Sequence, residues 1–484
     1  MRGVVAGIAA TLVLALPAAA QAVAFVPNDP LFPRQWYVGQ VHAFDAWDAP
    51  PTTLAPVLVA VVDSGIDAGH PEFAGRIAAK ATFVGGSAGT DEQGHGTFVA
   101  GEIAAATNNG VGIAGVALSA KLVVAKVVES DGTIFPQVEA KAIRWAVAQH
   151  ARVINLSFGA LRDPADPTRD EYSPVEAAAI RYAVSKGALV VAAVGNGDQA
   201  PTLPWAYASY PAALPHVLGV SALTRDGNVP GFSDRDTVYN DLSAPGADIF
   251  STFPRNLTAR SVGCVDQGYS DCADEDYKHA EGTSFAAPLV SAAAALMFAS
   301  NPALTADQAA ALLEHTVDDV APISGCRRCP PLRDALSGWG RLNVAAALAA
   351  EFEGPWPARD RSEPNDDAGT LAPKVYAATG SIAATIDYWD DPTDVYRVYL
   401  RRGQRLTATV EGPTGVGTAV SLWKPSTRTV FGASAGRKFR VAQAVKRGTI
   451  ARAVHQAKSA GWYYVQVSPT SRGYGAYTLR FTKS

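Results

Sequence analysis

The chain contains an apolar run, Val57-Leu58-Val59-Ala60-Val61-Val62, that ends at Asp63. Continuous β-branched runs of this length are typical of strands buried on both faces of a parallel sheet. Three more such runs occur at 122–127, 153–157 and 189–193, and segments with helical spacing at 136–150 and 174–186 separate them. This alternation predicts a doubly wound, mostly parallel α/β sheet between about residues 54 and 350. Ligands of such sheets bind beyond the carboxyl ends of the strands.

Two candidate functional residues lie beside predicted elements. Asp63 ends the first strand and precedes a turn at Ser64-Gly65, and alone it is equally well explained as a turn-capping residue. His95 lies between Gly94 and Gly96 at the start of a predicted helix, and a single histidine is most often structural. Together they suit catalysis, because a carboxylate holds the imidazole tautomer that accepts a hydroxyl proton.

Ser284 opens an Ala-rich run to residue 300 that predicts a buried helix. By itself this serine is explained as a helix N-cap, but the free N–H groups and the dipole of a helix start also suit a developing oxyanion. Asn196, between two glycines just past a buried strand, is either a turn residue or a second oxyanion donor. The chain order Asp, His, Ser matches one of the known orders of a Ser-His-Asp triad.

The chain resembles the subtilisin family of serine peptidases from about residue 25 to residue 350, through four segments: Val61-Val62-Asp63-Ser64-Gly65, Gly94-His95-Gly96-Thr97, Gly195-Asn196-Gly197 and Gly282-Thr283-Ser284-Phe285-Ala286-Ala287-Pro288. Within the family it is most similar to the thermitase branch, through Pro27-Asn28-Asp29-Pro30 and Trp47-Asp48. The resemblance implies an endopeptidase that hydrolyses proteins or peptides through an acyl-enzyme, without an organic cofactor. The implied roles are an orienting acid, a general base, a nucleophile and an oxyanion donor acting with the Ser284 backbone N–H, in the order Asp63, His95, Ser284 and Asn196.

The resemblance also implies a substrate-binding groove. Ser157-Phe158-Gly159 matches the strand that pairs with the substrate backbone, and Ala193-Val194-Gly195 matches one wall of the primary specificity pocket. Ser209 falls near the floor of that pocket. None of these residues is charged, so we expect a preference for apolar or aromatic substrate side chains.

The family's tight calcium site maps onto Asp29, Glu72 and the loop at 106–113. The implied ligands form the oxygen-rich set that calcium prefers, namely two carboxylates, the Asn109 amide and the carbonyls of Ala106, Val111 and Ile113. Glu72 stands where the family usually has Asp. The alternative is an ordinary Asn-Asn-Gly surface turn. A calcium ion at this place would be structural.

Four cysteines allow three disulfide pairings, and we favour the local pairs Cys264 with Cys272 and Cys326 with Cys329. The Cys-Arg-Arg-Cys spacing also occurs in redox and metal sites, but no strand-helix redox context or histidine cluster accompanies it. The first pair belongs to an acidic insertion at 254–280. That insertion either borders the substrate cleft or forms a solvated, disulfide-bonded loop.

The N-terminus predicts export. Arg2, an apolar run at 4–16 and small residues at Ala20 and Ala22 are typical of a secretory signal peptide of residues 1–22, the alternative being a buried helix. No later uninterrupted apolar run reaches about 18 residues, so we expect a secreted, soluble monomer without membrane contact after cleavage. The formal net charge is −4, with charges mixed along the chain, which gives no indication of nucleic-acid binding.

The 484-residue chain is long enough for two domains. A segment at 351–362, rich in Pro, Arg and acids, predicts a linker after a peptidase domain of residues 23–350. Beyond it, alternating segments at 394–400, 406–410, 463–467 and 477–481 predict antiparallel strands.

Residues 363–484 resemble the bacterial pre-peptidase C-terminal domain, through Glu363-Pro364-Asn365-Asp366-Asp367, Asp394-Val395-Tyr396 and Gly461-Trp462-Tyr463-Tyr464-Val465. This resemblance implies a small all-β sandwich. Calcium at Glu363, Asp366 or Asp394 is left unassigned. The alternative to an enzyme is an inactive, subtilisin-like binding or adhesion protein. An esterase or lipase would need a Gly-x-Ser-x-Gly elbow, which the segment around Ser284 does not supply.

Overall fold

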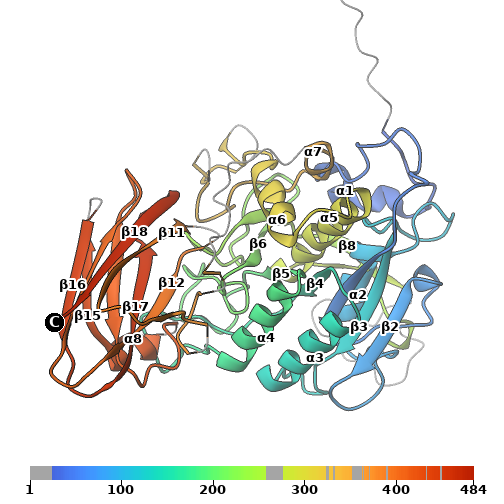
Figure 1. The fold of residues 1–484 in the computed structure, drawn as a ribbon. Coiled ribbons are helices and arrows are strands. Elements are labelled where there is room, and N and C mark those ends of the chain that lie inside the picture. The colour runs from blue at the N-terminus through green and yellow to red at the C-terminus, as the bar shows by residue number, and fades with distance from the viewer. Residues whose placement is uncertain are drawn as a thin grey trace, which may run out of the picture.

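Figure 1 shows the computed structural model, which describes residues 24–484 apart from 258–275, 323–325, 331–332, 351–361, 364, 370, 389–390, 432, 447–449 and 472. The predicted signal peptide therefore lies outside the described residues. So do Cys264, Cys272, most of the acidic insertion and nearly all of the predicted linker. Cys326 and Cys329 are joined by a disulfide, as the local pairing predicted for them.

Seven parallel strands form the central sheet of an α/β domain, in the order β2-β3-β1-β4-β5-β6-β7. Helices cover both faces of the sheet, which explains why most of its strands are continuous apolar runs. The edge strand β2 differs, because its residues alternate between half-buried and exposed. The strands are β1 (Val57–Asp63), β2 (Ile77–Thr82), β3 (Ala120–Lys126), β4 (Val153–Leu156), β5 (Leu189–Ala193), β6 (Val217–Leu223) and β7 (Leu242–Pro245).

Helices α2 (His95–Ala104) and α5 (Ala287–Ser300) pack on one face of the sheet, and α3 (Pro136–Ala148) and α4 (Pro174–Ser185) pack on the other. This arrangement confirms the predicted doubly wound α/β fold. The stretch Thr283–Ser300 is long and apolar enough to cross a membrane, judged by length and composition alone. It is 89% buried inside the protein, as expected for the central helix of a packed core.

Short elements complete the domain and connect its layers. They are η1 (Phe32–Arg34), α1 (Trp36–Gln40), η2 (Pro71–Phe73), the antiparallel pair β8 (Ile249–Thr252) and β9 (Tyr277–Ala280), η3 (Arg255–Leu257), η4 (Thr283–Phe285), α6 (Ala306–His315) and α7 (Val344–Ala349). The described ends of the 254–280 insertion thus include η3 and β9.

The carboxyl ends of three neighbouring strands meet at one edge of the sheet. β1 ends at Asp63, β4 ends just before Ser157, and β5 ends shortly before Asn196. β4 pairs in parallel with both β1 and β5, so these residues come to the same edge although they lie far apart in the sequence.

The second domain is all β. One sheet has the order β10-β12-β17-β14-β15 and the other β11-β18-β13-β16, and one apolar core contains side chains of both sheets. Apart from the parallel pair β10 and β12, neighbouring strands are antiparallel. The elements are β10 (Lys374–Val375), β11 (Thr379–Asp387), β12 (Asp394–Leu400), β13 (Arg405–Glu411), β14 (Thr418–Trp423), α8 (Ala433–Phe439), β15 (Arg440–Lys446), β16 (Ile450–Gln456), β17 (Gly461–Pro469) and β18 (Tyr474–Lys483).

The β domain contacts the side of the α/β domain that carries α4 (Figure 1). The ring of Tyr172, just before α4, stacks on Phe431 with centroids 6.1 Å apart, and its hydroxyl accepts a hydrogen bond from Thr429 at 3.1 Å. Arg181 on α4 lies 3.7 Å from a carboxylate oxygen of Asp367. The two domains therefore share apolar, polar and charged contacts.

Candidate active site

The contact between His95 and Asp63 is the centre of the site. His95 Nδ1 lies 2.9 Å from Asp63 Oδ1 and 3.0 Å from Oδ2, so Nδ1–H donates to the carboxylate and Nε2 is left to accept a proton. Asp63 is buried, and its Oδ1 also accepts the N–H of Ser64 at 2.7 Å. Burial lowers the pKa of His95, but the charge and hydrogen bond of Asp63, with the charge of Asp91, bring the pKa above its usual value.

A second buried carboxylate, Asp91, holds the segment that carries His95. It accepts five hydrogen bonds of 2.7 to 3.1 Å, from the N–H groups of Gln93, Gly94 and Thr97 and from the hydroxyls of Ser64 and Thr97. The N–H groups at the start of α2 have no acceptor within the helix, and a carboxylate there also favours the helix dipole. Asp91 therefore fixes the helix start on which His95 lies.

Gly96 allows α2 to lie close to the end of β1. A Cβ at this position would collide with the carbonyl oxygen of Gly65 and would lie 3.1 Å from the Cβ of Asp63. Gly94, the N-cap of α2, has a φ of +94°, which is a left-handed conformation that favours glycine. These two glycines therefore permit the close approach of His95 to Asp63.

Ser284 lies on the short helix η4, immediately before α5. Its carbonyl oxygen accepts a hydrogen bond from Ser157 Oγ at 2.7 Å. Asn155 donates to Ser157 Oγ and accepts from the hydroxyl of Ser291 on α5, both at 2.8 Å. This buried chain of hydrogen bonds ties the predicted nucleophile to the end of β4.

The ring of His95 packs against Phe285, the residue after Ser284, with centroids 5.3 Å apart. Phe285 also packs on Phe98 of α2 at 4.5 Å and is buried. The structure thus brings the segments of His95 and Ser284 into direct contact across the helix pair α2 and α5.

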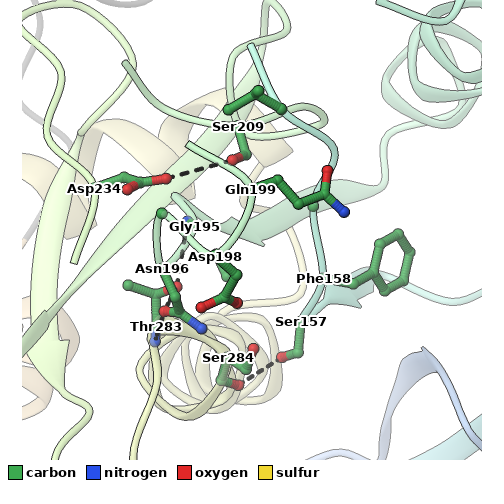
Figure 2. A pocket seen from close by; sticks show the side chains of 14 residues that line it. Ser157, Phe158, Gly195, Asn196, Asp198, Gln199, Ser209, Asp234, Thr283 and Ser284 are labelled. Carbon is green, nitrogen blue, oxygen red and sulfur yellow. Dashed lines mark hydrogen bonds between the residues drawn. The ribbon is translucent and has the colours of Figure 1, made fainter. Parts of the chain in front are cut away.

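The side chain of Asn196 has a fixed orientation. Its Oδ1 accepts two hydrogen bonds from Thr283, from the N–H at 2.9 Å and from the hydroxyl at 2.8 Å. Because a backbone N–H only donates, these bonds assign Oδ1 and leave Nδ2 as a donor. Figure 2 shows this amide nitrogen on the side that faces Ser284, which is where a second oxyanion donor is needed.

A cavity of about 260 Å³ opens beside Ser284 (Figure 2). Most residues of the predicted substrate groove line it, namely Ser157, Phe158, Gly159, Ala193, Gly195 and Ser209. Val194 does not, because its side chain points to the other side of the extended segment and is buried in the core beneath α3 and α4.

The prediction of an uncharged pocket was wrong. Asp198 and Asp234 also line the cavity, and they are the charged residues among those that line it. Asp234 follows β6 in the chain and reaches the pocket because its N–H donates to the carbonyl of Gly195 at 2.9 Å. The sequence motif of the pocket wall contains no signal of this pairing, since the partner is distant in the chain.

The predicted calcium segments come together in the structure. Both oxygens of the buried Asp29 accept backbone N–H groups of the 106–113 loop, at 2.7 Å from Asn108 and 3.1 Å from Asn109. Glu72 Oε1 accepts from Ile113 N–H at 2.7 Å and from the Tyr277 hydroxyl at 3.0 Å. Glu72 Oε2 is buried and has no hydrogen-bond partner among the described residues.

Two buried acids therefore lie close together at this loop. The pKa of Glu72 is raised to about 7, mainly by burial and in part by the charge of Asp29, although the hydrogen bonds from Ile113 and Tyr277 act in the opposite direction. Removing such repulsion is what a bound divalent cation does. The residues present thus fit calcium. The Glu72 side chain, which is one methylene longer than that of Asp, contacts the loop through the Ile113 N–H.

A second acidic cluster lies where the two domains meet. Possible ligand atoms of Glu363, Asp366 and His216 lie within 4.8 Å of one another, as do those of Glu363, Asp391 and Asp394. Burial, followed by the charges of Asp366 and Asp394, raises the pKa of Glu363 to about 9. His216 comes from the α/β domain, immediately before β6.

The comparisons with known proteins define the class. The chain belongs to the subtilase family, whose model matches residues 55–340. It is similar to thermitase from Thermoactinomyces vulgaris, with 32% identity over 300 residues, which cover 61% of this chain and 93% of thermitase. The cell wall-associated protease of Bacillus subtilis is 34% identical over 357 residues, which cover 67% of this chain and 36% of that protein.

Among solved structures, a protease from Pseudoalteromonas arctica has a TM-score of 0.54 and 28% identity, covering 67% of this chain and 98% of that chain. These relatives identify the chain as a subtilisin-like serine endopeptidase that acts on peptides or proteins. The family match ends before the β domain, so the resemblance to a pre-peptidase C-terminal domain stays a prediction.

Sequence reasoning missed three residues that shape the site: Asp91, Thr283 and Asp234. Asp91 lies three residues before the N-cap Gly94, so the usual N-cap pattern does not indicate it. Thr283 orients Asn196, but in the sequence it is recognisable only as the residue before Ser284. Asp234 had no local signal.

Proposed function

We propose that this endopeptidase works through Asp63, His95 and Ser284, with Asn196 and the Ser284 backbone N–H as oxyanion donors. The observation that carries the proposal is the contact of both Asp63 oxygens with His95 Nδ1, on a histidine whose ring packs beside the Ser284 segment. The fixed orientation of Asn196 supports the same site.

In the proposed reaction, Ser284 Oγ attacks the substrate carbonyl carbon while His95 Nε2 takes the hydroxyl proton. The oxygen of the tetrahedral intermediate receives hydrogen bonds from Asn196 Nδ2 and the Ser284 N–H. The C–N bond then breaks as His95 returns the proton to the leaving amine. This leaves the acyl part of the substrate bound to Ser284 Oγ as an ester. Water, activated by His95, hydrolyses this ester and restores the enzyme.

The test is fluorophosphonate labelling and casein cleavage by the purified full chain, compared with Ser284→Ala. Loss of labelling and a fall in kcat by about 10⁶-fold, the loss known for the nucleophile of a related subtilisin, is the expected result. Equal activity of the two proteins would refute the proposed nucleophile. Thr283→Ser is a matched control, because it keeps both hydrogen bonds to Asn196.

We propose that calcium binds at Asp29 and Glu72, with the Asn109 amide and the carbonyls of Ala106, Val111 and Ile113 completing the oxygen ligands. The buried, partnerless Glu72 Oε2 supports this site. We propose a second calcium site at the cluster of Glu363, Asp366 and Asp394. Glu363 Oε1 and both polar atoms of the Asn365 side chain also have no hydrogen-bond partner among the described residues.

Isothermal calcium titration of wild type, Glu72→Gln and Glu363→Gln tests both sites. We expect each variant to lose one binding event and to show a smaller stabilisation by calcium in thermal unfolding. Unchanged binding in either variant removes that site from the proposal.

We further propose secretion after removal of residues 1–22, and a C-terminal accessory domain of residues 363–484 following the 351–362 linker. The predicted export signal and the cell-wall association stated in the name of one relative support the location. The inactive binding or adhesion protein is not favoured, because the matched relatives are named as proteases. N-terminal sequencing of the mature protein tests the cleavage site.

A further inference from the structure

The cavity beside Ser284 is lined by acidic side chains but by no basic one. Fourteen residues line the cavity beside Ser284, and none of them is Lys, Arg or His. The acidic ones are two carboxylates: Asp198, which is exposed on the loop after Asn196, and Asp234, which is only 1% exposed.

Asp234 is poorly compensated for a buried carboxylate. Its Oδ2 accepts a hydrogen bond from the Ser209 hydroxyl at 3.5 Å, which is at the limit of a hydrogen bond, and Figure 2 shows this contact across the pocket. Its Oδ1 has no hydrogen bond of good geometry among the described residues, although the N–H of Gly197 is near enough to lower the pKa of the carboxyl. No ion pair of Asp234 occurs in the described part of the chain. A buried charge normally has a cation or several donors beside it.

The protonation of Asp234 reflects this environment. The pKa of the carboxyl is raised to about 8. Burial is the main cause and the charge of Asp198 adds to it, whereas the Gly197 N–H and the Ser209 hydroxyl act in the opposite direction. A cation that enters the pocket would replace the proton, because it stabilises the charged form. The group is thus prepared for a partner that the protein itself does not provide.

The backbone around Asp234 leaves the carboxylate facing the cavity. Gly195 has a φ of +108°, and a Cβ there would collide with Asp234 Oδ2 and Ser209 Oγ. On the opposite wall, a Cβ at Gly159 would lie 2.9 Å from Ser209 Cβ. No side chain from these two positions therefore separates the carboxylate from a substrate group in the pocket.

We propose that Asp234 makes the primary specificity pocket select a basic side chain, arginine or lysine, in the residue that precedes the scissile bond. This inference rests on the proposed function, because it requires Ser284 to be the nucleophile beside this pocket. A long basic side chain can bring its cation to Asp234 in the cavity wall, and arginine also offers the two parallel N–H donors that match a carboxylate.

The experiment compares four peptides that differ only in this residue, which is Arg, Lys, Leu or Phe. The enzymes are the wild-type full chain, Asp234→Asn, Asp234→Ser and Asp198→Asn. We expect wild type to have a higher kcat/KM for Arg than for Leu. Asp234→Asn should lower the Arg-to-Leu ratio by about 30-fold, the loss expected when one partner of a buried charge pair is removed. Asp198→Asn should change it much less, since Asp198 is exposed.

Cleavage of the Leu peptide shows that each variant is folded, and Asp234→Ser provides a second, smaller neutral residue in case the amide disturbs packing. The Arg-to-Leu ratio of wild type should also rise between pH 6 and pH 9 as Asp234 ionises. A wild-type preference for Leu or Phe, or a ratio unchanged in Asp234→Asn, overturns the inference. Failure of the proposed function looks different: wild type would then cleave none of the peptides and would not react with the fluorophosphonate.

Discussion

Replacing Asp91 by Asn tests how the fold places His95, the proposed general base. The carboxylate accepts five hydrogen bonds and is fully buried, so the variant keeps its shape but must place an NH₂ group where an oxygen was. If the NH₂ takes the position of Oδ2, it faces the N–H of Thr97. If it takes the position of Oδ1, it faces the N–H groups of Gln93 and Gly94.

The better of the two orientations therefore loses at least one N–H bond to a charged acceptor, about 1.5–3 kcal/mol. It also buries an amide group against another donor, which costs about 1–3 kcal/mol more. We expect a total loss of about 3–6 kcal/mol in the free energy of unfolding. For a domain of this size that corresponds to a fall of at least about 6 °C in the unfolding midpoint.

The assay is calorimetric unfolding of Asp91→Asn in a Ser284→Ala background, which prevents self-digestion. Asp226→Asn is the matched control, because Asp226 is exposed. In the active background, the acid limb of the pH–rate profile should also move to lower pH, since the charge of Asp91 helps to raise the pKa of His95. An unfolding midpoint within about 1 °C of the control, together with an unchanged acid limb of the pH–rate profile, would refute the role given to Asp91.

Three further outcomes are expected. Asn196→Ala should lower kcat by about 10²–10³-fold with little change in KM, the size known for this donor in a related subtilisin, and a change in KM alone would contradict the oxyanion role. Activity of the wild type should fall as the pH drops through the raised pKa of His95, because only the neutral ring accepts the proton. The acid limb of the pH–rate profile should therefore lie above the usual histidine pKa of 6.5, and a limb below that value argues against the Asp63 contact. Burial raises the pKa of Glu139, and the charge and hydrogen bond of Glu176 raise it further; burial also raises the pKa of Glu176 to about 7, although its hydrogen bond with Glu139 lowers it. Protonation of the pair is therefore complete at acid pH and is lost as the pH rises, which removes its contribution to stability. Glu139→Gln should therefore raise the unfolding midpoint at pH 9 more than at pH 5, and equal shifts at both values would show that the pair does not titrate in this range.

The sequence predicted well those parts of the fold that depend on the local backbone. The buried runs around residues 57–62 and 189–193 indicated parallel strands because a sheet covered on both faces requires apolar residues at every position. Asp63 and Asn196 could be placed since each directly follows such a strand. The short β12 segment was predicted at its observed bounds from alternation alone.

What lies between distant segments was decided only by tertiary structure. Asp234 reaches the cavity beside Ser284 through a backbone pairing with Gly195, and His216 meets Asp366 across the domain boundary. Neither contact has a local pattern, because a buried carboxylate looks the same in sequence as a surface one. The sequence by itself thus determined the fold class and the order of the proposed catalytic segments, through periodicity and turn chemistry. The packing of the chain determined the charge of the pocket and the environment of each acid, because burial and neighbours, not residue type alone, set the pKa of an ionisable group.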